Sequence, residues 1–358
     1  MPSSADRVAT AVRRQPDEGL AYPFGREGPA AGELIPVAEG VGWARLPVPG
    51  SLRHINVWAL DDGDGVALVD TGLDIAQCRE AWDALFAGGL AGRRVTRVIV
   101  THFHPDHVGL AGWLCRRFDA PLWMNRTEYL LARLAIADQR PEPPAEQVAQ
   151  RIAAGWSEAQ VDAERGMGWG RFARIAAPLP IGHVAFAEGD ELAIGDRRWR
   201  VMTGSGHTPE HCALVDVEGG LMIAGDQLLP RISSNISLGA MEPEADPLAD
   251  WLASLARFQR DLDPAILVLP AHGEPFTGAH VRLAALAAGH ADRLDALELL
   301  LREAPRRAID CFITLFGREL DDSVIGLATG EALAHLRWLE RVGRARREVR
   351  DGVWWFSA

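Results

Sequence analysis

The sequence predicts a mixed α/β protein, because short β-branched runs alternate with longer segments of helical spacing along most of its 358 residues. Two further observations refine this prediction. Several of the short runs end in a histidine or an aspartate beside a glycine, a residue that permits tight turns. Toward the C-terminus the pattern becomes mainly helical and ends in a hairpin. We therefore expect a large α/β domain with a helical insertion, followed by a smaller C-terminal unit.

The composition restricts the class of protein. Hydrophobic residues make up 48% of the chain, which is enough for a sizeable core. The formal net charge of -12 disfavours a general nucleic-acid binder, because an acidic protein repels phosphates. The four cysteines are scattered, which argues against a disulfide framework. We find no signal peptide and no membrane-spanning stretch, and we expect a cytoplasmic protein that does not contact membranes.

The first part of the chain predicts an arm and then the α/β domain. Residues 1–33 are rich in Pro, Gly and charge, and we expect them to form an N-terminal arm. Residues 34–285 form the α/β domain. Its early elements are expected to be a strand at 55–60, a strand at 66–70, a helix at 75–86, and strands at 95–101 and 121–124.

A segment of different character interrupts this domain at about residues 125–182. Helical spacing at 128–137 and 145–154 is separated by prolines, and several glycines break the pattern that follows. We interpret the segment as a helical insertion that can cover an active site. After it, strands are expected at 191–194, 199–203, 212–217 and 221–224, then a helix at 251–261 and a strand at 265–269.

Residues 286–358 predict a winged-helix-like unit. Helices are expected at 291–303, 308–316 and 331–342, and residues 345–356 alternate around a turn that is typical of a hairpin. Acidic and basic residues are almost equal in number here, so we favour a structural role or a homodimer contact over nucleic-acid binding. A basic run from Arg341 to Arg350 leaves a nucleic-acid partner as an alternative.

A group of histidines directly after the strand at 95–101 carries the chemistry. His102, His104 and His107 fall close together with Asp106 among them, and Pro105 prevents a helix from running through the group. Such a loop can direct neighbouring side chains inward at two centres. Imidazole and carboxylate ligands together suit zinc, iron or manganese rather than calcium.

Three later segments share one pattern, in which a polar residue closes a strand beside a glycine. They are Gly206-His207-Thr208-Pro209, Gly225-Asp226 and His272-Gly273. With the earlier H-x-H-x-D-H run, this order resembles the metallo-β-lactamase superfamily over about residues 50–275. The resemblance implies a four-layer αβ/βα sandwich with metals at one sheet edge. The C-terminal region resembles the subgroup that contains the lactamase-like protein 2 ribonucleases.

The same resemblance implies two divalent metal ions, zinc first, with iron or manganese as alternatives. One ion would have three histidine ligands, the other two histidines and a carboxylate, and one further aspartate would bridge them. The implied ligands are His102, His104 and His207 for the first ion, Asp106, His107 and His272 for the second, and Asp226 as the bridge.

Other residues have supporting assignments. The resemblance implies that Asp70 orients a histidine ligand, while Asp106 can aim the attacking water in addition to binding a metal. Arg231 can hold a substrate carboxylate or phosphate, and His54 lies near the expected rim of the site. His211 follows His207 by four positions, but its counterpart in the family is not usually a ligand, so we do not assign it.

The expected chemistry is hydrolysis. Two metal ions can lower the pKa of a shared water from about 15.7 toward neutrality, and no serine or cysteine nucleophile is needed. A metal-bridging hydroxide would attack an ester, thioester or lactone of a small molecule. Two alternatives stay open, namely a single-strand RNA endonuclease that uses the same metals and a metal-bound binding module without catalysis.

Overall fold

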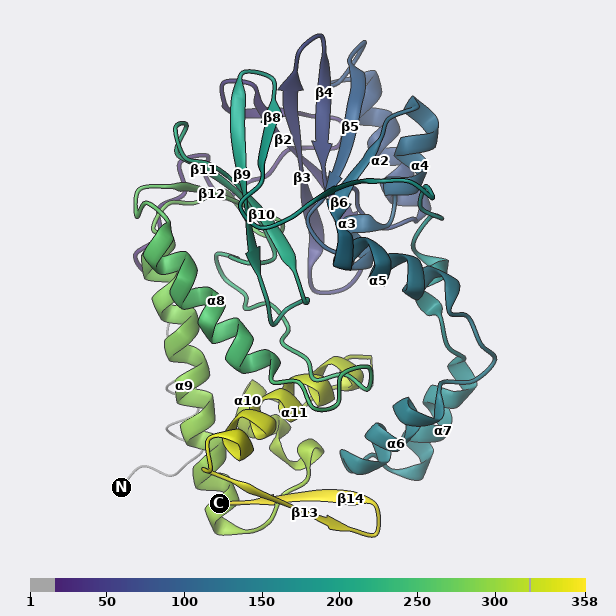
Figure 1. Cartoon of the computed structure of the whole chain (residues 1–358), viewed down its shortest axis with the longest axis vertical. Coiled ribbons are helices and arrows are strands. Elements are labelled where there is room, and N and C mark those ends of the chain that lie inside the picture. The colour runs from purple at the N-terminus through teal and green to yellow at the C-terminus, as the bar shows by residue number, and fades with distance from the viewer. Residues whose placement is uncertain (1–16, 322) are drawn as a thin grey trace.

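The computed structural model describes residues 17–321 and 323–358, and in these residues two large β-sheets pack face to face between layers of helices (Figure 1). This arrangement is the predicted αβ/βα sandwich, so the predicted fold class is confirmed. A separate two-stranded hairpin lies at the C-terminal end of the chain.

The first sheet follows chain order from one edge to the other. Its strands are β1 (Ile35–Ala38), β2 (Val41–Val48), β3 (Arg53–Asp62), β4 (Gly65–Val69), β5 (Arg94–Val100), β6 (Leu122–Asn125) and β7 (Val184–Phe186). Neighbours are antiparallel from β1 to β4 and parallel from β4 to β7. Because parallel strands end at the same edge of a sheet, the segments after β4 and β5 lie side by side there.

The second sheet supplies the opposite side of that edge. In spatial order its strands are β12 (Leu267–Pro270), β11 (Leu221–Gly225), β10 (His211–Asp216), β9 (Arg197–Gly204) and β8 (Glu191–Ile194). The pair β11–β12 is parallel and the other pairs are antiparallel. Asp226 and His272 follow the ends of the parallel pair, and the connection from β9 to β10 carries His207.

Apolar side chains bury both faces of each sheet. Between the sheets lie Trp43, Trp58 and Trp199, each at most 1% exposed. Helices α2 (Ala76–Ala87) and α4 (Ala111–Phe118) cover the outer face of the first sheet. Helices α8 (Pro247–Asp261) and α9 (Ala279–Glu303) cover the outer face of the second. Burial on both faces explains why β4 and β11 read as nearly continuous apolar runs.

The insertion between β6 and β7 is helical, as predicted. It contains α5 (Arg126–Ala137), α6 (Ala145–Ala153), α7 (Glu158–Met167) and a short 3-10 turn at Arg171–Arg174. The sequence analysis missed α7, which begins with a capping box made by Ser157 and Gln160. Helices α6 and α7 extend away from α5 and lie beside the C-terminal elements (Figure 1). The amide nitrogen of Ile309 donates to Ala154 O at 3.3 Å across that contact.

The C-terminal region contains the predicted helices and hairpin, but their limits differ. Helix α9 begins at Ala279, so the expected boundary between residues 285 and 286 falls inside it. The expected helix at 308–316 is a 3-10 turn at Ala308–Cys311 followed by α10 (Phe312–Phe316). Helix α11 (Ile325–Arg341) precedes the antiparallel strands β13 (Arg346–Arg350) and β14 (Val353–Ser357).

One buried apolar cluster joins this region to the sandwich. Leu255 of α8, Leu283 of α9 and Leu336 of α11 belong to the same cluster, and each is at most 1% exposed. The C-terminal helices therefore share their core with the helix layer on the second sheet.

The N-terminal arm is described only in part. Residues 1–16 lie outside the described residues, and residues 17–33 run along the sandwich, where Ala21 forms a β-bridge with Thr277. No helix in the described ranges combines the length and apolar character that crossing a membrane requires.

Candidate metal centre

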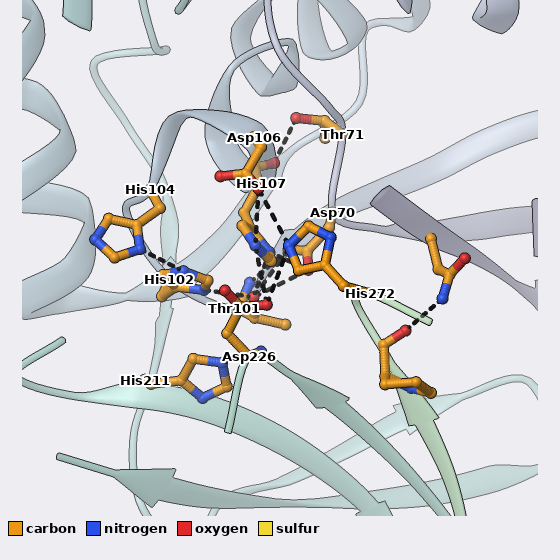
Figure 2. A network of polar contacts seen from close by, with 12 residues as sticks. Asp70, Thr71, Thr101, His102, His104, Asp106, His107, His211, Asp226 and His272 are labelled. Atoms are coloured by element: carbon orange, nitrogen blue, oxygen red, sulfur yellow. Dashed lines mark hydrogen bonds and ion pairs between the residues drawn. The ribbon is translucent and has the colours of Figure 1, made fainter. Parts of the chain in front are cut away.

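The structure brings together all seven side chains that the sequence analysis assigned to metal ions, at the edge where β5, β11 and β12 end. Figure 2 shows how those on the loop after β5 point toward Asp226 and His272 on the opposite sheet. Pro105 does not exclude a helix here but begins one. It starts the single turn α3 (Pro105–Val108), whose first position favours proline because no backbone N–H is needed there.

Three histidine nitrogens form one compact group. His104 Nδ1 lies 3.0 Å from His102 Nε2 and 3.0 Å from His207 Nε2, and the latter two atoms are 3.3 Å apart. Nitrogens that bind one tetrahedral ion at about 2.0–2.1 Å lie roughly 3.3 Å from one another. The spacing of this group therefore suits the three-histidine face of a tetrahedral site.

A second group lies beside the first. Asp106 Oδ2 is 3.3 Å from His272 Nε2 and 3.7 Å from His107 Nε2. Asp226 Oδ1 is 3.5 Å from both of these nitrogens, while its Oδ2 is 3.4 Å from His207 Nε2 in the first group. The carboxylate of Asp226 therefore presents one oxygen to each group.

Unpartnered polar atoms test whether these residues fit a metal. Among the described residues, His107 Nε2, His272 Nε2 and Asp226 Oδ1 are buried side-chain atoms without a hydrogen-bond partner. A buried polar atom without a partner is costly, so such atoms are rare in folded proteins. A divalent cation between these three atoms would supply a partner to each of them, and the residues therefore fit a metal site.

The electrostatics of the first group also favour metal binding. Burial lowers the pKa of His102 well below its usual value, with His107 adding to the effect. Burial and the neighbouring His207 together lower the pKa of His104 to about 3. Both rings are therefore neutral near pH 7, and neutral imidazole is the form that binds metals.

The second group carries an excess of negative charge. Burial raises the pKa of Asp106, but His107 and His272 outweigh it and lower that pKa to about 2. Burial lowers the pKa of His107, but the carboxylates of Asp70, Asp106 and Asp226 raise it well above its usual value. A cation in this space would neutralise the same carboxylates that otherwise hold a proton on His107.

Some of the histidine rings have a partner that fixes their orientation. Asp70 Oδ2 lies 2.8 Å from His107 Nδ1, and Asp70 Oδ1 accepts the Thr101 amide at 2.9 Å. His207 Nδ1 donates to the carbonyl oxygen of Asn235 at 2.9 Å. These contacts leave Nε2 of His107 and His207 directed at the metal space.

Glu128 is a buried residue beside the first histidine group that the sequence analysis missed. It lies on α5, is fully buried, and accepts hydrogen bonds from the Phe103 amide at 2.9 Å and the Thr208 hydroxyl at 2.7 Å. Burial raises the pKa of Glu128, although the hydrogen bond from the Glu210 amide opposes this. One side chain thus joins the two loops that carry the first ligand group. In the sequence it looks like an ordinary acidic residue in the first turn of a helix.

His211 lies in the site without belonging to either ligand group. It is fully buried, and its Nε2 accepts the backbone amide of Asp226 at 3.0 Å. A Cβ on Gly225 would stand 2.5 Å from that nitrogen, so glycine is required beside the bridging aspartate. The one sign of this role in the sequence is that His211 follows His207 by four positions. His211 positions Asp226 through its backbone.

The two predicted substrate contacts lie beside the loop that carries His272. His54 Nε2 accepts the Gly273 amide at 3.2 Å, and its carbonyl oxygen accepts from His272 Nδ1 at 2.8 Å. Arg231 Nη1 pairs with Glu274 Oε2 at 2.5 Å. Both side chains therefore have protein partners, and their contact with substrate stays a prediction.

Comparisons with known proteins agree with this architecture. A model described as the metallo-beta-lactamase superfamily matches residues 50–272, and one described as a metallo-beta-lactamase-like C-terminal domain matches residues 294–358. A crystal structure of a beta-lactamase domain protein from Burkholderia ambifaria is similar, with a TM-score of 0.89 and 40% identity, covering 96% of this chain and 99% of that one.

Two curated proteins are similar at lower identity. The probable metallo-hydrolase YqjP of Bacillus subtilis is 26% identical over 301 residues, covering 83% of this chain and 91% of the relative. The human protein named acyl-coenzyme A thioesterase MBLAC2 is 24% identical over 200 residues, covering 53% of this chain and 64% of the relative.

Proposed function

The chain belongs to the metallo-β-lactamase superfamily and is a metal-dependent hydrolase, and we propose that it uses two divalent metal ions, zinc first, to hydrolyse an ester, thioester or lactone of a small molecule. One observation carries the proposal. The two oxygens of Asp226 face two separate groups of histidines, 3.4 Å from the first and 3.5 Å from the second. A carboxylate that presents one oxygen to each group is suited to bind two adjacent metal ions.

The residues of the chain have distinct parts in this reaction. Two metal ions bound by these residues would lower the pKa of a water and polarise the carbonyl oxygen of the substrate. Asp106 is ionised at neutral pH, and its side chain is 15% exposed, so it can accept a hydrogen bond from the attacking water and orient it. The carboxylate of Asp70 keeps the ring of His107 fixed meanwhile.

The relative named an acyl-coenzyme A thioesterase favours a thioester among the three substrate classes. The C-terminal hairpin gives less support to the RNA alternative, because two of its arginines are already paired with carboxylates. Arg347 lies 3.2 Å from Glu340 and Arg350 lies 2.8 Å from Glu348. A phosphate backbone would have to displace these carboxylates before it gained the same contacts.

The test combines metal analysis with an activity panel. Elemental analysis of the full chain should find about two zinc ions per molecule, as the two-metal mechanism requires. Thioesters, esters and lactones should be hydrolysed and single-stranded RNA left intact. Asp226→Ala should lose both metal and activity, whereas Asp83→Ala, an exposed aspartate on α2, should retain them.

Several outcomes would reject the proposal. Full metal content and full rate in Asp226→Ala would remove the bridging assignment. Cleavage of RNA alone would favour the endonuclease, and a metal-loaded protein inactive toward every substrate would favour a binding module.

A further inference from the structure

A cavity of about 670 Å³ lies between the helical insertion and the start of α11, outside the metal centre. Helices α6 and α7 form one wall, residues 237–239 a second, and residues 323–330 a third. Cavities of about 300–1,000 Å³ are of the size that holds small-molecule ligands. None of the residues assigned to the metals lines this cavity.

The wall made by α7 contains an apolar stripe beside the polar residues Gln160 and Glu164. Ala159, Ala163 and Met167 line the cavity at four-residue spacing, which places them on one face of the helix. All three are exposed, and Met167 is 44% exposed. Leu327, which also lines the cavity, is 59% exposed. An apolar stripe left open to solvent in this way is typical of a binding surface.

The polar groups of the lining are mostly satisfied by the protein itself. Arg151 Nε lies 3.2 Å from Glu164 Oε1, so the two charges compensate each other. Gln150 Nε2 donates to the carbonyl oxygen of Leu238 at 3.3 Å. Since these polar groups have protein partners, the apolar side chains of the lining are the part most available to a ligand.

Two residues of the lining are linked to the metal centre through neighbouring residues. Arg171 lines the cavity, and the ring of the next residue, Phe172, stacks on Phe103 with centroids 6.4 Å apart. Phe103 lies between two metal-ligand histidines in the sequence. On the other side, Ser237 lines the cavity and its hydroxyl donates to the side chain of Asn235. The carbonyl of Asn235 in turn accepts from His207.

The cavity is formed in advance of any ligand. The Leu238 amide donates to Gly330 O at 3.0 Å, which fixes the second wall to α11. A Cβ on Gly330 would stand 2.6 Å from Ser237 Oγ, so this close approach depends on glycine. Trp156 Nε1 donates to Thr329 Oγ1 at 2.9 Å and fixes the insertion to the same helix. A preorganised pocket avoids the entropic cost of ordering its walls when a ligand binds.

We propose that this cavity binds the aliphatic chain of an acyl substrate whose carbonyl group lies at the metal centre. The inference rests on the proposed hydrolysis of an ester or thioester, and it adds that the acyl portion is a medium or long hydrocarbon chain. The apolar stripe on α7 supplies the binding surface, and the segments on either side of the cavity lead to Phe103 and His207.

The first experiment compares acyl chain lengths on the zinc-loaded full chain. For p-nitrophenyl esters from acetyl to decanoyl, kcat/KM should rise with length, because each buried methylene is worth roughly fourfold in binding. In Ala163→Phe the added ring occupies part of the cavity next to α7, and the decanoyl-to-acetyl ratio of kcat/KM should fall about tenfold or more. Ala149→Phe is the matched control, since Ala149 is exposed on α6 and does not line the cavity. An equal ratio in the wild type and Ala163→Phe would overturn the proposal.

The second experiment measures binding without hydrolysis. Calorimetric titration of the same metal-loaded proteins with 1-decanol should show saturable binding to the wild type and Ala149→Phe. The affinity of Ala163→Phe for 1-decanol should be lower than that of the wild type by about tenfold or more. Absence of binding to the wild type would overturn the cavity assignment even if short esters are hydrolysed. A third outcome is that decanol binds, that Ala163→Phe weakens this binding, and that no ester is hydrolysed. This outcome would reject the proposed hydrolysis and keep the aliphatic binding site.

Discussion

The carboxylate of Glu128 accepts a hydrogen bond of 2.7 Å from the hydroxyl of Thr208, 80 positions further along the chain. The same carboxylate accepts the backbone amide of Phe103 at 2.9 Å. Phe103 belongs to the loop after the first sheet's β5, and Thr208 belongs to the loop between β9 and β10 of the second sheet. This buried side chain therefore sets the distance between histidines that come from opposite sheets.

Replacing this carboxylate should loosen the first metal group. In Glu128→Gln the amide keeps the shape of the side chain but offers one acceptor where the carboxylate offers several. We expect a loss of about 1–3 kcal/mol in the free energy of unfolding. Metal affinity should fall about 10–100-fold, as measured by competition with a chelator. Glu158→Gln, at an exposed first-turn glutamate of α7, is the matched control. Equal metal affinity in the two variants would show that Glu128 has no part in metal binding.

The contact between Asp70 and His107 leads to a prediction about the second group. Asp70→Asn replaces a carboxylate that lies 2.8 Å from His107 Nδ1, so the ring loses its charged partner. Metal affinity at the second group should fall about 10–100-fold, while the first group keeps its ion. Titration with limiting zinc should therefore detect one tight site and one weakened site. Two tight sites in the variant would contradict this role of Asp70.

Removing the metal should destabilise the folded chain. When no cation lies between them, the buried polar atoms of His107, His272 and Asp226 have no partner, and their burial then destabilises the folded state. A metal at 1,000 times its Kd stabilises the folded state by about 4 kcal/mol. Scanning calorimetry should find a lower Tm after treatment with a chelator and recovery on addition of zinc. The same Tm in both states would mean that these residues hold no tightly bound ion.

A pH dependence should arise from a histidine pair in the C-terminal core. His290 Nδ1 lies 3.1 Å from His335 Nε2, and burial lowers the pKa of His335 to about 4. Because the unfolded chain binds this proton near pH 6.5, protonation favours unfolding. The stability that the folded chain gains from a neutral His335 is therefore complete above pH 6.5 and is lost as the pH falls toward 4.

The size of this effect can be measured with one substitution. The lowered pKa of His335 corresponds to a change of about 3 kcal/mol at most in the free energy of unfolding. Urea unfolding of the wild type and His335→Gln at pH 7 and pH 4.5 isolates the contribution. The wild type should lose more stability between the two pH values than the variant does. An equal loss would exclude His335 as the source.

The sequence predicted which seven side chains come together, because each of them lies near a strand end that has its own pattern. Asp226 follows an apolar run and a glycine, and the apolar run reports burial directly. Glu128 could not be found this way, because its importance lies in contacts 25 and 80 positions away along the chain. His211 was not assigned because its counterpart in the family is not usually a ligand, and its contact with the Asp226 amide leaves no pattern in the sequence.

The elements of the fold also divide into those that the sequence pattern predicted and those that it missed. The core strands were predicted because burial on both faces gives continuous apolar runs. Strands β1, β2 and β7 were missed because they are short or contain residues such as Gly42 and Pro47 that are untypical of strands. Helix α7 was missed because exposed small residues occupy the face that lines the cavity, which removes its hydrophobic periodicity.

Helix α9 runs without interruption from the helix layer of the sandwich into the C-terminal region, and the residues on either side of residue 286 pack into one core. The two regions that separate family models match are therefore not separate folding units. We expect them to unfold in one cooperative transition, and an exchange of the C-terminal region between relatives would succeed only if the buried faces of α8 and α9 were exchanged with it.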